Sequence, residues 1–348
     1  MRVVEPYLQK VYYCLALDPI HVGTGGYRLG EVDLTIVREP GTNLPKIPGS
    51  SLAGSARAYT AMATGKYRRE ERREGNGGES RYISCAGKGG EDGSEHCGEI
   101  DCPVCVAYGF AHGPQNRSFQ GLAQFYDAQI LFFPVHSMVG PVWVTAPQVL
   151  AEACSAWSED QRPAGHQIRT VPGLVPERAE GQRRGLNLGW LFLALQADDL
   201  AVDAIWSNLG LPGDLARIKE RLVLVPDDLF SLVVNNNLEV RTSVSIDPDT
   251  GAAKDGALFT FEALPRGTVL RFPVVYHDPQ HYVFPKWEEA ENAVRPTPFP
   301  ANRTRDWIQK NVEKGLKLME YLGVGGMNTR GLGRLRVLGL QEEGGDAH

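Results

Sequence analysis

The sequence has no hydrophobic run long enough to cross a membrane. A bilayer-spanning helix needs about 18–20 consecutive apolar residues. The richest apolar stretch, residues 130–144, is interrupted by Pro134, His136 and Pro141. The first residues, 1–6 (MRVVEP), carry charges and a proline where a secretory signal has an apolar core. We therefore expect a cytoplasmic protein that makes no contact with a membrane.

The sequence also lacks a strong excess of either charge and any compositional bias. Its 348 residues include 36 Lys and Arg and 42 Asp and Glu, for a formal net charge of −6. Apolar residues make up 42% and charged residues 22%, which excludes collagen, coiled coil and wholesale disorder. The mild acidity argues against bulk binding of nucleic acid, although a local basic surface would still allow it.

Several catalytic motifs are missing. The glycine-rich segment 323–333 has no lysine in the position that a P-loop requires, and it does not open a helix after a strand as a dinucleotide fingerprint does. Two residues after Ser51 stands Ala53, where a nucleophile elbow needs glycine. These absences disfavour a freestanding enzyme that acts on a small molecule.

Cysteines are few, but most of them are clustered. The clustered ones are Cys85, Cys97, Cys102 and Cys105. The last two have the two-residue gap of a zinc knuckle, and four thiolates complete a closed, structural zinc site. Such an ion would stabilise a polar insertion that cannot hold itself together. His96 is an alternative fourth ligand, and unrelated thiols in a loose loop are the other interpretation.

The alternation of strand-like and helix-like patterns predicts an α+β fold. Strands are expected at residues 10–18, 31–39, 122–135, 186–196 and 334–340. Helices are expected from residue 50, over 199–209 and 214–222, and from residue 302. The mixed charges of residues 68–74 suggest a solvated helix end. A long hairpin is expected over 239–270, with its turn at 247–251.

Two segments have features of an anion-binding backbone. Ser50 and Ser51 precede a helix, where they can cap it or leave its first amides free for a phosphate, and Arg57 could add a cation. The glycine-rich segment 323–333 can present clustered amides beside Arg330. An ordinary helix cap and an ordinary sharp turn are the respective alternatives.

Two polar residues near the N-terminus are candidates for chemistry. Asp33 stands between the apolar Val32 and Leu34 and could position one hydrated magnesium ion or orient a hydroxyl. A satisfied aspartate at a strand edge is the alternative. His21, in a glycine-rich loop, could be a base or merely a polar loop residue.

The order of these motifs resembles that of the RAMP proteins, the RNA-binding subunits of CRISPR effector complexes. More narrowly, it resembles the repeated backbone subunit of the type III-B (Cmr) complex, which slices target RNA. The motifs are HVGTG at 21–25, GEVD at 30–33, PKIPGSSLAG at 45–54, FFPVHS at 132–137, WVT at 143–145, EVRTSVSID at 239–247 and the terminal glycine-rich loop. The resemblance spans residues 8 to 340, and it covers 66–98 and 150–185 poorly. Ala53 and His136 stand where the family commonly has lysine and arginine.

The resemblance implies one domain over residues 1–348 with a modified RNA-recognition (ferredoxin-like) fold. It would carry a zinc-stapled insertion at 66–106, an irregular insertion at 150–185 and a thumb-like β-hairpin at about 239–270. Several copies would line up in a filament along the CRISPR RNA, beside other Cmr-type effector subunits.

The resemblance also implies roles for individual residues. RNA contacts would come from His21, Ser50, Ser51, Arg57, Arg241, Ile246, Gly325, Gly326, Thr329 and Arg330. The thumb would splay the duplex of CRISPR RNA and target RNA, and Asp33 with Mg²⁺ or Mn²⁺ would cleave the target beside each splayed nucleotide. A splayed nucleotide can align its own 2′-hydroxyl with the adjacent phosphate, so a single carboxylate suffices. A filament subunit in which Asp33 is catalytically idle is the alternative.

Overall fold

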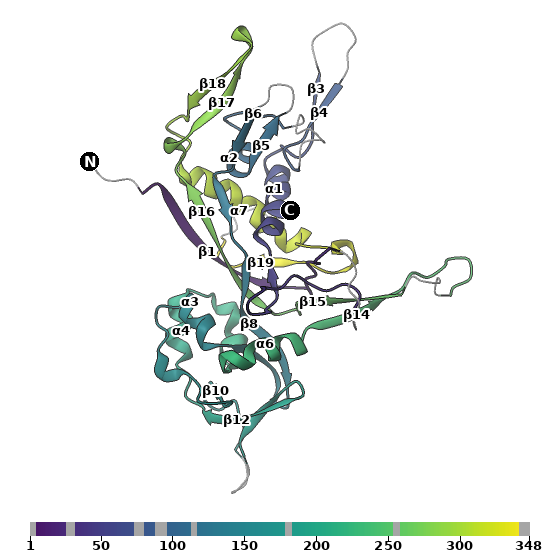
Figure 1. Ribbon diagram of the computed structural model, residues 1–348, viewed down its shortest axis with the longest axis vertical. Helices are drawn as coiled ribbons and strands as arrows, with labels where there is room; N and C mark the ends of the chain where they lie inside the picture. Colours follow the sequence, from purple (N-terminus) through teal and green to yellow (C-terminus); the bar gives the residue numbers. More distant parts are fainter. Residues whose placement is uncertain are drawn as a thin grey trace.

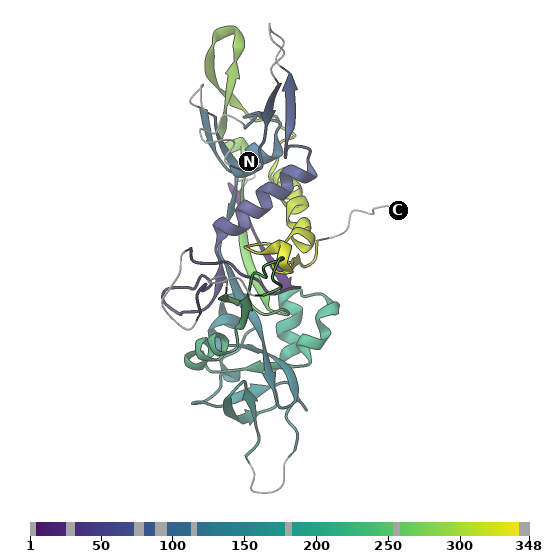
Figure 2. The same cartoon turned by 90° about the vertical axis from the view of Figure 1, so that its right-hand side faces the viewer.

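The computed structural model describes most of the chain, in separate stretches. They comprise residues 5–25, 32–72, 80–87, 96–112, 117–177, 183–252 and 258–340. The molecule is elongated, with a sheet and two long helices near its middle and hairpins that project from this body (Figures 1 and 2).

Four antiparallel strands form one end of the main sheet. In spatial order they are β8 (Ala128–Ser137), β16 (Val269–His277), β1 (Tyr7–Ala16) and β19 (Leu335–Val337). Helix α1 (Gly49–Ala63) lies between β1 and β8 in the chain, and helix α7 (Arg305–Leu322) lies between β16 and β19. The connectivity is therefore β-α-β-β-α-β, and the two inner strands of the four are β16 and β1. This arrangement is that of a ferredoxin-like fold.

The two helices pack against each other and against one face of this sheet. Alternate residues of β1, from Tyr12 to Ala16, are buried on the helix side, as the two-residue period of a strand requires. The buried face of α7 consists of Ile308, Asn311, Val312, Gly315, Leu316 and Met319, which confirms most of the predicted apolar stripe. None of the helices in the described part of the chain is both long enough and apolar enough to span a membrane.

The main sheet continues beyond β8 into a second region, at the lower end of Figure 1. Its further strands are β9 (Gly140–Thr145), β13 (Leu222–Leu224), β10 (Ile168–Thr170), β12 (Leu191–Ala197) and β11 (Gly185–Leu188). Helices α3 (Pro147–Ala153), α4 (Val202–Leu209), α5 (Ala216–Lys219) and α6 (Asp227–Asn236) accompany them. Two short strands, β2 (Lys46–Ile47) and β7 (Ala123–Phe125), pair with β8 and β16.

Among the described residues, four two-stranded hairpins lie outside the main sheet. They pair β3 (Arg69–Arg72) with β4 (Ser80–Ile83), β5 (Gly109–His112) with β6 (Arg117–Gln120), β14 (Glu239–Ser243) with β15 (Phe259–Ala263), and β17 (Val283–Glu288) with β18 (Ala293–Pro298). Helix α2 (Pro103–Tyr108) precedes β5. In Figure 1 the β14–β15 hairpin projects sideways from the body, while β3–β4 and β17–β18 project from the upper end.

Several predicted boundaries were wrong. Residues 32–39 make only isolated bridges, because they lie along other segments without a continuous partner strand. Residues 186–196 are two strands rather than one, since Gly189 adopts a positive φ of 63° and turns the chain. Residues 69–72 form a strand rather than a helix end, because mixed charges are equally compatible with either element. The hairpin predicted for 239–270 ends at Ala263, and β16 belongs to the main sheet.

Other boundaries moved for similar reasons. The segment 150–185 is less irregular than predicted, since it contains the end of α3 and all of β10. The helix predicted for 214–222 is confined to Ala216–Lys219. Leu222, the last residue of the predicted helix, begins strand β13 instead. The C-terminal helix begins at Arg305, where the Thr304 side chain accepts a hydrogen bond from the Trp307 amide.

Gly315 permits the close contact between α1 and α7, which gives a first prediction. A Cβ at this position would lie 2.3 Å from Thr60 Oγ1 and 2.5 Å from the Ala56 carbonyl oxygen. Gly315→Ala should therefore lower the free energy of unfolding by about 1–3 kcal/mol through overpacking. Denaturant titration measures this change.

Gly54 on α1 is the matched control, since a Cβ at this position would meet nothing within 4 Å. Gly54→Ala should be neutral or stabilising by up to about 1 kcal/mol, the ordinary helix-propensity gain. Equal effects of the two substitutions would contradict this account of the helix contact.

Candidate functional site

His21 lies between the β14–β15 hairpin and the glycine-rich loop near the C-terminus. Its backbone oxygen accepts a hydrogen bond of 2.9 Å from the Gly326 amide. Its Nδ1 lies 2.6 Å from the carbonyl oxygen of Glu262, and its ring meets the ring of Phe261 edge-on at 5.7 Å between centroids. The side chain is 6% exposed. The structure thus brings His21 together with the predicted residues Gly325 and Gly326.

Gly325 is required where the loop passes over His21. Its φ is +87°, and a Cβ would lie 2.4 Å from the backbone oxygen of His21. The loop is closed at its base by the Val324 amide, which donates to the Gly333 oxygen at 2.8 Å. Thr329 and Arg330 are exposed on its outer turn. The loop therefore has a fixed base and an accessible outer turn.

The carboxylate of Asp33 is held by strand β15. Its Oδ2 accepts hydrogen bonds from the Thr260 amide at 2.7 Å and from the Thr260 hydroxyl at 3.0 Å. The Asp33 amide in turn donates to Thr260 Oγ1 at 3.1 Å. The backbone N–H of Thr260, followed by its hydroxyl, holds the pKa of Asp33 below its usual range. An ionised carboxylate at this position can bind a divalent cation or orient a hydroxyl.

The segment around Asp33 is docked on the same strand by further bonds. The Leu34 amide donates to the Thr260 oxygen at 3.1 Å, and the Glu262 amide donates to the Leu34 oxygen at 3.0 Å. The Arg38 guanidinium donates to both carboxylate oxygens of Glu262, at 2.9 and 3.0 Å. Sequence reasoning missed Thr260, Glu262 and Arg38, because nothing in their local pattern shows that they meet across more than two hundred residues.

Ser50 and Ser51 lie in the first turn of α1, but neither caps it. The cap position is Pro48, with no side-chain cap. The Gly49 amide donates to Asp127 Oδ1 at 2.7 Å, and the Ser51 amide donates to the Pro48 oxygen. The prediction of a serine cap is therefore wrong, because a carboxylate from a neighbouring loop takes that role. Ser50 is exposed and Ser51 is partly exposed, so both stay accessible to a ligand.

Arg57 faces the cysteine insertion rather than the start of α1. Its Nε donates to the Cys85 carbonyl oxygen at 2.8 Å, and its Nη1 donates to the Tyr108 oxygen at 3.4 Å. Its Nη2 lies 2.9 Å from His96 Nε2. The structure does not bring Arg57 together with Ser50 and Ser51, and an RNA contact of this residue stays a prediction.

Arg241 and Ile246 belong to the β14–β15 hairpin and the turn that follows β14. Arg241 is exposed and pairs with Glu239 at 2.5 Å. Ile246 is 57% exposed. Both are therefore accessible to a ligand.

The sulfur atoms of Cys85, Cys97, Cys102 and Cys105 converge on one point. All lie within 4.8 Å of one another. The separations are 3.5 Å for 85–97, 3.7 Å for 97–105 and 85–105, and 3.9 Å for 85–102. Four thiolates about 2.3 Å from a central zinc ion form a tetrahedron with edges of about 3.8 Å. The geometry thus fits one tetrahedral metal ion.

Repulsion between the sulfur atoms also favours a bound cation. Four thiolates so close together repel one another, and a cation at the centre removes that cost.

His96 is not part of this cluster. Its Nδ1 lies 3.0 Å from the Ala111 oxygen and its Nε2 lies 2.7 Å from the Gly87 oxygen. Both ring nitrogens are thus engaged by the backbone. The alternative in which His96 replaces a cysteine ligand is wrong, because the ring is turned toward these carbonyl groups.

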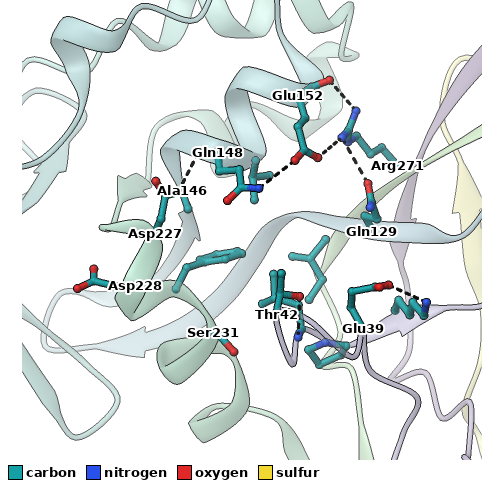
Figure 3. A pocket seen from close by; sticks show the side chains of 16 residues that line it. Glu39, Thr42, Gln129, Ala146, Gln148, Glu152, Asp227, Asp228, Ser231 and Arg271 are labelled. Carbon is teal, nitrogen blue, oxygen red and sulfur yellow. Dashed lines mark hydrogen bonds and ion pairs between the residues drawn. The ribbon is translucent and has the colours of Figure 1, made fainter.

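A cavity of about 330 Å³ is formed by residues of β8, α3, α6 and the loop before β2 (Figure 3). Its charged groups are paired: Arg271 contacts Glu152 at 3.1 Å, and Lys46 contacts Glu39 at 2.7 Å. None of the residues predicted for a site lines this cavity in the described part of the chain. It is therefore separate from the candidate site.

Comparison with known proteins identifies the family. The model of the RAMP superfamily matches residues 13–336. The chain belongs to the RAMP superfamily. The CRISPR system Cmr endoribonuclease Cmr4 of Pyrococcus furiosus is 28% identical over 281 residues, which are 76% of this chain and 80% of that protein.

Solved structures of Cmr proteins share the fold of this chain. A chain of the type III-B Cmr-beta complex bound to cognate target RNA superposes with a TM-score of 0.57 at 16% identity, over 96% of this chain and 98% of that one. Oligomeric Cmr4 from Pyrococcus furiosus gives a TM-score of 0.55 at 19% identity, over 95% of this chain and 98% of that one. At such identities the likeness extends to the fold alone.

The contact of the RAMP chain's glycine-rich loop with His21 gives a second prediction. Gly325→Ala adds a Cβ that clashes with the His21 oxygen and strains a positive φ. It should cost about 2–4 kcal/mol of unfolding free energy, the sum of overpacking and left-handed strain. Gly331 has a φ of +77°, and a Cβ there would meet nothing within 4 Å. Gly331→Ala should therefore cost only about 1–2 kcal/mol, the strain alone. Denaturant titration compares the two, and equal losses would show that the contact with His21 is unimportant.

Proposed function

We propose that this RAMP protein is a backbone subunit of a type III-B CRISPR effector complex that binds the CRISPR RNA and cleaves complementary target RNA through Asp33. One observation carries the catalytic part: an ionised carboxylate is fixed at the base of an exposed hairpin by two hydrogen bonds to Thr260. The family membership and the relative named as an endoribonuclease support the same function.

The guide RNA would be held mainly by backbone and small polar groups. The accessible start of α1 offers Ser50 and Ser51, and the outer turn of the glycine-rich loop offers Thr329 and Arg330. His21 would act by supporting that loop through the Gly326 amide. Amide groups bind phosphates without reading bases, so sequence specificity would come from base pairing between guide and target. This mode of binding is compatible with a net charge of −6.

In the cleavage step the RNA would supply the nucleophile, and the protein would mainly orient it. The β14–β15 hairpin, acting as a thumb with Arg241 and Ile246 exposed, would separate the duplex and turn one nucleotide out. The target's 2′-hydroxyl would then lose its proton to water and attack the adjacent phosphate in line, which forms a 2′,3′-cyclic phosphate. The bond to the 5′-oxygen of the next nucleotide would break, and that oxygen would leave with a proton taken from water. Orientation of such an internal nucleophile supplies much of the rate enhancement.

A divalent cation, Mg²⁺ or Mn²⁺, is compatible with the donors at Asp33. Oδ2 is occupied by Thr260, whereas Oδ1 has no hydrogen bond within the described residues. One carboxylate oxygen suits Mg²⁺, which keeps several waters and takes other ligands from phosphates. Bound there, the ion would supply charge stabilisation at the reacting phosphate. Asp33 would position it, and Thr260 would keep Asp33 in place.

The assembly would contain several copies of this chain and other Cmr-type subunits. Cmr4 from Pyrococcus furiosus is oligomeric, and a similar chain belongs to a Cmr complex bound to target RNA. These two structures support a filament of copies along the CRISPR RNA.

We also propose that the four-cysteine cluster holds one structural zinc ion. All four donors are sulfur, the arrangement is tetrahedral, and no position is left open for a substrate, which is typical of a structural site. Cys102 also accepts a hydrogen bond from the Cys105 amide at the start of α2. The ion would therefore anchor the insertion at 66–106 to the α1 side of the fold.

Removal of the Asp33 carboxylate gives a third prediction. In a reconstituted complex, Asp33→Ala should lower the single-turnover rate of target cleavage at least about 100-fold, because metal positioning is lost. Affinity for target RNA should be unchanged, since base pairing provides it. Asp160→Ala, an exposed aspartate in the second region, is the control and should cleave normally. Cleavage by Asp33→Ala at the normal rate would leave this chain as a non-catalytic filament subunit.

Loss of one thiol gives a fourth prediction. Cys102→Ser should reduce bound zinc from one ion per chain to nearly none and lower the thermal midpoint by several degrees, since metal binding contributes to folding. Cys154→Ala, at a buried cysteine outside the cluster, should keep its zinc. Elemental analysis and thermal melts measure both effects. Native protein without zinc would contradict the proposal.

A further inference from the structure

We infer that Thr260 is a positioning residue for Asp33. Its hydrogen bonds fix the carboxylate proposed to cleave RNA to the β14–β15 hairpin. This inference rests on the proposed function and deepens it. Asp33 comes from the loop that follows β1, and Thr260 comes from the returning strand of the hairpin, 227 residues later in the chain. The contact between them joins the group that would cleave to the element that would open the duplex.

The hydroxyl of Thr260 bonds Asp33 in two ways at once. It accepts the Asp33 amide at 3.1 Å and donates to Oδ2 of the same residue at 3.0 Å. The Thr260 amide adds a second bond to Oδ2 at 2.7 Å. Both the main chain and the side chain of Asp33 are therefore fixed by one residue, and Oδ1 accepts neither of these two bonds.

The strand that carries Thr260 is itself held at its base. The Leu34 amide donates a hydrogen bond to the Thr260 oxygen, and the Glu262 amide donates one to the Leu34 oxygen, so residues 33–38 and β15 are bonded in both directions. Arg38 binds the Glu262 carboxylate, and its Nε donates to Asn235 Oδ1 at 2.9 Å. His21 Nδ1 lies 2.6 Å from the backbone carbonyl oxygen of Glu262. These contacts fix the base of the hairpin relative to the main sheet.

These contacts keep the distance between the β14–β15 hairpin and the Asp33 carboxylate constant. Wherever the hairpin inserts into a guide–target duplex, Asp33 would lie at the same distance from the interruption. Preorganisation of this kind matters because a misplacement of about 1 Å can cost about 100-fold in rate. The Thr260 hydroxyl is therefore expected to affect the cleavage step and the metal requirement, but not target binding.

The test compares Thr260→Val with Thr260→Ser in a reconstituted complex. Val keeps the branched shape and the amide but loses the hydroxyl, whereas Ser keeps the hydroxyl. Thr260→Val should lower the single-turnover cleavage rate about 10- to 100-fold and raise the Mg²⁺ concentration for half-maximal rate. Thr260→Ser should stay within about threefold of the native rate. Affinity for target RNA should be native in both.

Thr242 provides a matched control on the neighbouring strand. It pairs directly with Thr260 in the β14–β15 register and is exposed. Thr242→Val removes a hydroxyl from the same hairpin without touching Asp33, so it should cleave at the native rate. If Thr260→Val does not assemble, Thr260→Ala is compared with Thr242→Ala in the same way.

Each outcome decides one claim. Native cleavage by Thr260→Val, together with an inactive Asp33→Ala, would overturn the positioning role and leave the proposed function standing. Equal losses in the Val and Ser variants with weaker target binding would assign Thr260 a purely structural role. Native cleavage by Asp33→Ala would overturn both the function and the inference.

Discussion

Hydrogen bonds from Thr260 and a bridge between Leu34 and Phe261 attach the segment that carries Asp33 to strand β15. This attachment joins three parts of the molecule: the loop that follows β1, the projecting hairpin and, through His21, the glycine-rich loop. Without it, Asp33 would lie on a segment that makes only isolated bridges. The candidate site therefore depends on a tertiary contact rather than on any one motif.

The residues around this contact are ordered by a partly buried ion pair. Arg38 and Glu262 are 20% and 14% exposed, and Nη2 of Arg38 lies within hydrogen-bond distance of both carboxylate oxygens. Hydrogen bonds between two charged groups are stronger than those between neutral ones. The cysteine cluster performs a similar task at the other end of the fold. There Arg57 links α1 to the insertion through the Cys85 oxygen. In both places a compact polar connection acts together with buried apolar side chains, such as Val106 and Phe261, to fix an element to the rest of the fold.

Sequence reasoning succeeded where a signal is local and periodic. The four-residue spacing from Ile308 to Leu316 predicts the buried face of α7, and the spacing of the cysteines predicts their convergence. It failed where the signal is a partner far away in the chain. The cap of α1 comes from Asp127, Arg57 turns to the insertion, and Thr260 meets Asp33, none of which a local pattern can indicate. The resemblance to RAMP proteins pointed to Asp33 but not to the residue that holds it.

The central claim is that an RNA duplex opened by the hairpin is cut beside Asp33 with a divalent ion. The most direct measurement maps the cleavage products of a complementary target RNA on the assembled complex, with Mg²⁺ and with chelator. We predict cuts at regular intervals along the paired region that vanish when the metal is removed. An intact target, or regular cuts that persist without divalent metal, would contradict it.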